Sequence, residues 1–267
     1  MGFHIVVCGS IVPDPLQTLE PMQGPQGWAL KNEMMLPAVL DPWAGHALYE
    51  AANLAKKVPD SKVWLVCVGP KAKLQQVMMS VGQKVPFQLV VLDGPAGGFV
   101  DGFDTAAALA AAIDGIADLD KSKLLLFGGW QSASRGTGAT MQMVGERLGV
   151  AEQFQGVDVC APQADGSLTI KERVEGGSYL VSTLAAPPAV LGWATGNLPE
   201  PPNNPQIGMQ NMRAIMPAIQ QAKPAPIKGE GLAWTGVALP KQTRTTRIVK
   251  DTPVDDIAKE IVDWIRG

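Results

Sequence analysis

The chain has 267 residues, 46% of them hydrophobic, which is enough to bury the core of one large domain. Its 22 basic and 25 acidic side chains leave a net charge of −3 without a long run of one sign, so no nucleic-acid partner is expected. Only 18% of the residues are charged, below the roughly 25% of typical soluble domains. Either a partner covers part of the surface, or the core is large.

Three cysteines, Cys8, Cys67 and Cys160, stand far apart among apolar residues. An odd number of scattered cysteines favours buried thiols over disulfide bonds or a metal cluster. The N-terminus enters a strand-like run within a few residues and lacks the basic and apolar regions of a signal peptide. No apolar run is long enough for a membrane helix. We therefore expect a cytoplasmic protein with no bound metal and no stable membrane insertion.

Short apolar runs rich in β-branched residues alternate with helical patterns through the first half of the chain. This alternation is typical of a parallel sheet covered by helices on both faces. The predicted strands are 3–8, 62–68, 88–92 and 124–127, and the predicted helices are 44–57, 71–81, 105–117 and 139–148. Right-handed crossovers should join them into an open, mostly parallel, Rossmann-like α/β sheet of the adenine-nucleotide-binding type, occupying residues 1–186.

The second half of the chain has a different pattern. Runs 158–161, 168–174 and 177–184 alternate like an antiparallel meander, so the sheet should end mixed. Segment 187–226 has nine prolines in 40 residues and few charges. We expect it to lack regular structure and to lie against a partner or against its own domain.

A final helix is predicted over residues 253–266, with Thr252 as the candidate N-cap. Its apolar residues fall on one stripe, as in an amphipathic helix. They are Val254, Ile257, Ile261, Val262 and Ile265.

The residues of common catalytic sites are scarce in this chain. His4 and His46 are the only histidines, and no nucleophile elbow or Cys-x-x-Cys motif occurs. His4 begins an apolar strand, where a structural histidine is more common than a catalytic one. The sequence therefore argues against a hydrolase.

The loop 128–138, between the fourth predicted strand and its helix, is the best candidate for a ligand site. Ligands of open parallel sheets bind outside the carboxyl ends of the strands, and the N-terminus of a helix attracts anions. Gly136 and Gly138 permit close approach of the backbone, Thr137 offers a hydroxyl, and Arg135 offers a planar fork suited to phosphate. Small residues at the neighbouring strand ends predict a crevice there, although glycine at such turns can also be purely structural.

The order of several motifs resembles the β subunit of electron-transfer flavoproteins. The motifs are Ile5-Val6-Val7-Cys8, then Leu40-Asp41-Pro42-Trp43, then Val66-Cys67-Val68-Gly69-Pro70, then the loop 128–138, and finally Glu175-Gly176-Gly177 followed by Pro187-Pro188-Ala189-Val190-Leu191. The resemblance runs through most of the chain.

This resemblance implies a heterodimer in which an α subunit holds most of the FAD site. The β subunit would bind AMP, or a second FAD in bifurcating members. Carried over residue by residue, the nucleotide contacts would be Cys8, Asp41, Val68, Arg135, Gly136, Thr137 and Gly138.

The resemblance also implies contacts with other proteins. Segment 187–226 would recognise flavin dehydrogenases such as acyl-CoA dehydrogenases, with Met212 as an apolar anchor flanked by Met209 and Ile215. Residues 227–267 would form an extended C-terminal arm that packs on the α subunit.

This sequence departs from the family pattern at the expected nucleotide site. The loop 128–138 has no carboxylate, Asp41 replaces an Asn, and residues 9–11 lack the usual lysine. An added acid and a lost lysine weaken the attraction for phosphate, with Arg135 as compensation. We interpret the chain as an electron-carrier subunit and not as an enzyme. The alternatives are a bifurcating subunit that binds its own FAD and oxidises NADH, or a stand-alone adenine-nucleotide-binding module.

Overall fold

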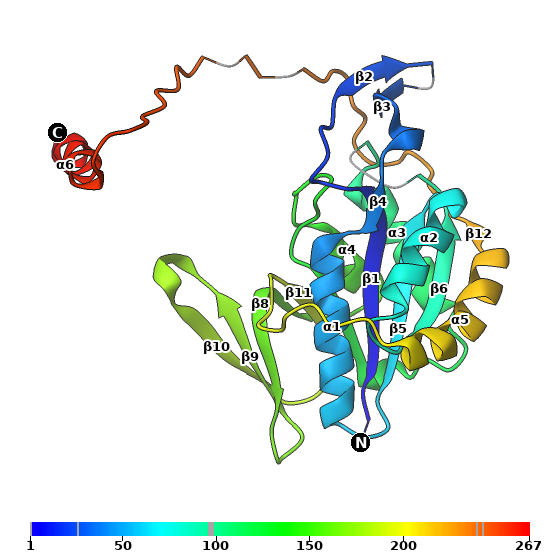
Figure 1. The fold of residues 1–267 in the computed structure, drawn as a ribbon. Helices are drawn as coiled ribbons and strands as arrows, with labels where there is room; N and C mark the ends of the chain where they lie inside the picture. The colour runs from blue at the N-terminus through cyan, green and yellow to red at the C-terminus, as the bar shows by residue number, and fades with distance from the viewer. Residues whose placement is uncertain (1, 26, 96–98, 239, 242) are drawn as a thin grey trace. The chain divides into compact units, whose positions relative to one another are not determined.

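One mixed sheet of ten strands organises the part of the chain that the structure, a computed structural model, describes: residues 2–25, 27–95, 99–238, 240–241 and 243–267 (Figure 1). The strand order is β10-β9-β8-β11-β7-β1-β5-β6-β12, and β4 pairs with β1. The ten strands are β1 (His4–Pro13), β4 (Ala38–Leu40), β5 (Lys62–Gly69), β6 (Gln88–Asp93), β7 (Leu124–Gly129), β8 (Glu152–Pro162), β9 (Leu168–Arg173), β10 (Tyr179–Leu184), β11 (Ala189–Trp193) and β12 (Lys223–Pro224).

The pairing confirms the prediction of a mostly parallel sheet that ends mixed. All neighbours from β8 to β12 along this order are parallel, whereas β8–β9, β9–β10 and β1–β4 are antiparallel. From β1 the chain first builds outward through β5 and β6 and then returns to the other side of β1 with β7. The order therefore reverses between β1 and β7, which is where an open α/β sheet forms its ligand crevice.

Helices cover both faces of this sheet. They are α1 (Pro42–Lys57), α2 (Lys71–Val81), α3 (Gly102–Asp114), α4 (Thr140–Arg147) and α5 (Pro205–Gln220). Side chains of α1, α2 and α5 join one apolar cluster, and those of α3 and α4 join another on the opposite face. The predicted helices are confirmed, with ends shifted by up to three residues.

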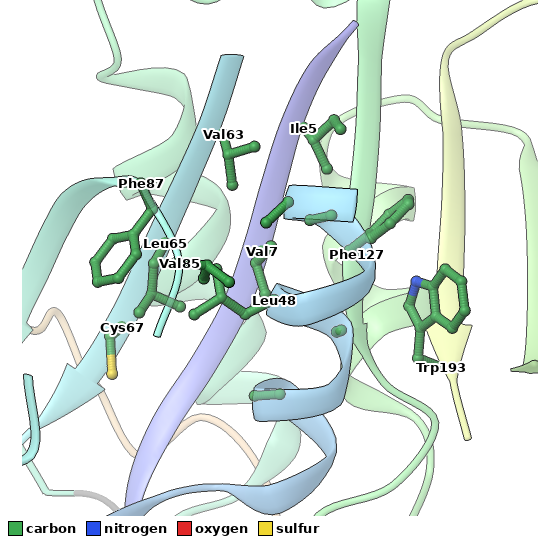
Figure 2. Close-up of a cluster of buried hydrophobic side chains, with 14 of the residues drawn as sticks. Ile5, Val7, Leu48, Val63, Leu65, Cys67, Val85, Phe87, Phe127 and Trp193 are labelled. Carbon is green, nitrogen blue, oxygen red and sulfur yellow. The ribbon is translucent and has the colours of Figure 1, made fainter. Parts of the chain in front are cut away.

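The central strands alternate their side chains between the two clusters. Ile5 and Val7 of β1 point into the first cluster, shown in Figure 2, whereas Val6 and Cys8 point into the second. All four are buried, as are the alternating residues of β5. A strand buried on both faces reads as a continuous apolar run, which is why these strands were predictable.

The prediction that segment 187–226 lacks regular structure is wrong. It contains β11, whose five residues are all buried between β7 and β8, and the 16-residue helix α5. The prolines mostly lie outside these elements or at a position that tolerates them. Pro205 is the first residue of α5, where its missing N–H costs no hydrogen bond, and Asn204 caps the helix by accepting from Gln206 N at 3.0 Å.

Several short elements were not predicted from the sequence. Strands β2 (Pro21–Gly24) and β3 (Gly27–Leu30) form a separate hairpin, and the short 3₁₀ helix η1 (Glu33–Met35) follows it. Two other 3₁₀ turns are η2 (Lys121–Lys123) and η3 (Glu175–Gly177).

The described chain divides into two compact units, Met1–Val237 and Ala238–Gly267. The second unit contains α6 (Val254–Arg266), which matches the predicted final helix. The predicted N-cap is wrong, because Thr252 Oγ1 donates to Lys250 O and does not cap the helix. No helix among the described residues is long and apolar enough to cross a membrane.

Candidate functional site

A cleft opens at the reversal of strand order between β1 and β7. It encloses about 780 Å³, its open mouth included. Its wall is built from the end of β1, the start of α1, the end of β5, the start of α3 and the loop after β7. A site of this size at a topological switch point suits a small organic ligand such as a mononucleotide.

Six of the seven predicted nucleotide contacts line this cleft. They are Cys8, Asp41, Val68, Arg135, Thr137 and Gly138. Gly136 lies in the same loop but is not one of the lining residues. The structure thus brings together residues from four separate stretches of the sequence, as expected if strand ends meet at one edge.

Glycines give the loop after β7 its shape. Gly138 has a φ of 69°, and a Cβ at that position would lie 3.0 Å from Trp130 O. Gly136 has a φ of 68°, which is also in the left-handed region. The carbonyl of Gly138 accepts from Gln155 Nε2 at 2.9 Å, which ties the end of the loop to β8.

Asp41 joins the loop to the start of α1. It caps the helix by accepting from Trp43 N at 3.1 Å, and its other carboxylate oxygen accepts from Ala133 N at 2.8 Å. Burial raises the pKa of this carboxyl, and the backbone N–H bonds oppose that rise. Part of its expected role as a ligand contact is therefore structural.

The expected free phosphate fork on Arg135 is not present. One terminal nitrogen of Arg135 donates to Val100 O, and the other donates to Asp101 Oδ2 at 3.1 Å. The guanidinium also lies 5.6 Å from the centre of the Trp234 ring, within the range of a cation–π contact. Its Nε is buried without a hydrogen-bond partner. The charge of Arg135 is therefore paired with Asp101, and its buried Nε–H is a donor that no described residue accepts from.

Asp101 was missed by the sequence analysis. It caps α3 by accepting from Phe103 N at 2.8 Å. Burial raises the pKa of this carboxyl, but the bonds from Phe103 N–H and Arg135 outweigh that effect and lower it overall. An Asp one residue before a helix is a recognisable N-cap signal, but its pairing with the later loop is a tertiary event.

Hydroxyl groups form most of the polar wall of the cleft. Six serine and threonine residues contribute: Ser10, Thr105, Ser132, Ser134, Thr137 and Thr140. The remaining wall is mainly apolar, with Cys8, Ala44, Val68, Leu109 and Met141. Burial raises the pKa of the Cys8 thiol to about 12, so this cysteine stays protonated at neutral pH and packs as an apolar group.

A second polar network lies on the other side of α1. The buried carboxylate of Glu50 accepts from Asn197 N at 3.1 Å, and Asp158 forms a two-bond pair with Arg173 at 2.9 and 3.0 Å. A Cβ on Gly196 would lie 2.5 Å from Glu50 Oε1, so the carboxylate reaches the backbone only beside a glycine. This network anchors the connection between β11 and α5.

The histidines take no part in the cleft. His4 Nδ1 accepts from Asp120 N at 2.8 Å, and its ring centre lies 5.2 Å from that of Trp64. Burial, above all, lowers its pKa. His4 is therefore a structural histidine in this chain. Within the described ranges, no group of three or more His, Cys, Asp or Glu side chains is placed to bind a metal.

The three residues expected to contact a partner all lie on α5, but they do not share one exposed face of that helix. Met209 is 66% exposed and Met212 is half-buried, but Ile215 is fully buried against Gly82, the residue that follows α2, and its neighbours. Asn211, also buried, donates from Nδ2 to Gly82 O and Val85 O at 2.7 and 2.8 Å. Ile215 therefore belongs to the core, because a 16-residue helix turns one of its faces inward.

The sheet order and the cleft at its reversal define this chain as a Rossmann-like α/β protein. The family model of the electron transfer flavoprotein domain matches residues 32–231, about three quarters of its length. The chain therefore belongs to the electron transfer flavoprotein domain family. A search among curated proteins finds no match.

Proposed function

We propose that this chain is the β subunit of a heterodimeric electron-transfer flavoprotein, which relays electrons between flavin dehydrogenases and a downstream acceptor. FAD supplies the redox chemistry when bound, and most of its site would lie on the α subunit. This chain would pack against the α subunit and bind an adenine nucleotide in its own cleft. It would carry electrons without making or breaking bonds in a substrate.

The observation that carries this proposal is the apolar face of α6. Val254, Ile261 and Ile265 are 79%, 49% and 72% exposed, and Trp264 on the same helix is 81% exposed. So much apolar surface on one short helix is typical of a protein–protein contact. We assign it, with the arm from residue 227 onward, to the α subunit.

The cleft fits the adenylate part of the proposal. Its hydroxyl groups suit a ribose and its apolar side chains suit a base. The buried Nε of Arg135 is a donor that the described residues leave unpaired. The nucleotide would be held by five further lining residues: Cys8, Asp41, Val68, Thr137 and Gly138.

A dehydrogenase would dock on the outer face of α5. Met209 and Met212 lie on that face, and a flexible thioether can adapt to more than one partner surface. We retain these two residues as candidate contacts. Ile215 packs on the buried side of the same helix.

One observation favours the bifurcating alternative, in which this chain holds its own FAD and oxidises NADH. A second cleft, of about 1600 Å³ with its open mouth, shares Pro95, Val100 and Ser134 with the first. Its walls carry Trp28, Phe99 and Trp234. Adjoining space with aromatic walls suits a dinucleotide longer than AMP.

The test is to purify the native complex through a tag on this chain and to release its cofactors. We expect a second polypeptide in equal amount, one FAD and one AMP per pair. Two FAD molecules per pair would replace the carrier with the bifurcating alternative. A colourless, stable monomer that binds ATP would contradict both and support a stand-alone nucleotide-binding module. As a control, the chain produced alone should hold little FAD.

A further inference from the structure

The cleft has few charges for a site expected to bind phosphate. Among its described lining residues, only Asp41 and Arg135 carry charged side chains. Asp41 is 4% exposed, and both of its oxygens accept from backbone N–H groups. The charge balance of the cleft therefore depends on whether Arg135 is available to a ligand.

Arg135 is already neutralised by the protein. Its partner Asp101 is nearly buried, with 10% of its side chain exposed, as is Arg135 with 14%. In such a setting a pair at 3.1 Å is screened far less than a surface pair. Arg135, Asp101 and Asp41 together contribute one negative charge, so their summed field does not attract an anion.

The loop also uses several of its own backbone donors. Ala133 N donates to Asp41, Arg135 N donates to Ser132 Oγ at 3.1 Å, and Gly136 N reaches the same hydroxyl at 3.4 Å. These are N–H groups that a phosphate-binding loop would turn toward its ligand. In this chain they hold the loop together.

Apart from the unpaired Nε of Arg135, the groups that the described lining residues leave free for a ligand are uncharged. Hydroxyls of Ser10, Thr137 and Thr140 line the cleft together with the apolar side chains of Val68, Leu109 and Met141. Hydroxyl donors and acceptors match a ribose, and apolar walls match a base. The phosphate of a nucleotide finds no uncommitted cationic side chain among the described residues that line the cleft.

We propose that the cleft recognises the adenosine moiety and gains little from the phosphate that follows it. This inference rests on the proposed function, in which the cleft binds an adenine nucleotide. It specifies which part of that nucleotide the cleft recognises. AMP and adenosine should bind with dissociation constants within about tenfold of each other. A cleft that ignores the charge after the ribose can hold AMP or the adenylate end of FAD alike.

The experiment measures the binding of AMP and of adenosine to the full-length chain by titration calorimetry. The main variant is Asp101→Asn, which removes the counter-charge of Arg135, whereas the Asn oxygen can still cap α3. It should strengthen AMP binding by about tenfold or more and leave adenosine unchanged, because a freed guanidinium can pair with phosphate.

The double variant Asp101→Asn with Arg135→Gln is the matched control. It removes the ion pair without changing the net charge, and should return the AMP-to-adenosine ratio to that of the unmodified chain. If the unmodified chain prefers AMP by more than about tenfold and the double variant loses this preference, Arg135 binds the phosphate directly and the inference is wrong. If neither probe binds, the inference also falls, while the flavin content of the native complex tests the proposed function separately.

Discussion

Helix α5 buries its apolar face within the chain, whereas helix α6 carries a similar face that stays exposed. In α5, Ile215 and Ile219 are 0% and 5% exposed. In α6 no residue is buried, although its polar and apolar sides are more sharply separated. Both helices thus have an amphipathic sequence pattern, but the apolar residues are buried in α5 and exposed in α6.

The difference lies in what each helix packs against. Helix α5 lies along α2 and β6, and Asn211 joins it to the segment that follows α2 through two hydrogen bonds. Its burial stabilises the fold of this chain. No residue of α6 is buried, and an exposed apolar face of this kind is typical of a contact with another chain. One helix is therefore expected to govern stability and the other association.

The largest expected effect on stability comes from Ile215→Ala. Removal of a fully buried side chain between α5 and α2 should lower the free energy of unfolding by about 2 to 5 kcal/mol, measured by urea denaturation of the full chain. If that variant does not fold, Ile215→Val should cost about 0.5 to 1.5 kcal/mol. Met209→Ala, on the exposed side of the same helix, should change stability by less than about 0.5 kcal/mol. Equal effects at both positions would remove the distinction between the two faces.

A second prediction concerns α6. The double variant Ile261→Asp with Ile265→Asp should leave the unfolding free energy of the isolated chain within about 1 kcal/mol, because both side chains are exposed. It should weaken capture of the α subunit by at least about 100-fold, since two apolar contacts are lost and two charges are buried. Pull-down and titration of the co-expressed pair measure this. The control is Lys259→Ala on the polar side of α6, and loss of capture by that control would show that the apolar stripe is not the contact.

The smallest expected effect is a pH dependence at the connection that leads into α5. Burial raises the pKa of Glu50 above its ordinary value of 4.5, against the opposing bonds from backbone N–H groups. The folded chain therefore binds this proton more tightly than the unfolded chain, and the ionised carboxylate costs stability above its folded-state pKa. As the pH falls through that pKa toward 4.5, the unmodified chain should gain stability relative to Glu50→Gln. Urea midpoints of both proteins at about pH 7.5 and about pH 5 measure the change, and a difference that does not vary with pH would contradict it.

The sequence predicted much of this fold because its central strands are buried on both sides. Runs such as Val63–Val68 have a clear type and length, and their order along the chain implied a parallel sheet. The prediction failed in segment 187–226, where the number of prolines was considered but not their positions. Proline counts hid β11 and α5, because prolines before a strand or at the first turn of a helix do not prevent either element.

The site was predictable only in part, for a related reason. Strand ends of a parallel sheet meet at one edge, so Cys8, Asp41, Val68 and Thr137 could be grouped from the sequence. Nothing local, however, indicates that Arg135 will pair with Asp101, which lies 34 residues earlier in the chain. The charge available to a ligand is set by that pairing.

By itself, the sequence determined the α/β type of this protein, the edge of the sheet where the cleft opens and the amphipathic character of its last helix, because burial and periodicity are properties of contiguous residues. Only the tertiary structure decided that Ile215 faces the core and that Arg135 is neutralised. These outcomes depend on contacts between segments far apart in the chain, and such contacts decide which side chains are left for a partner or a ligand.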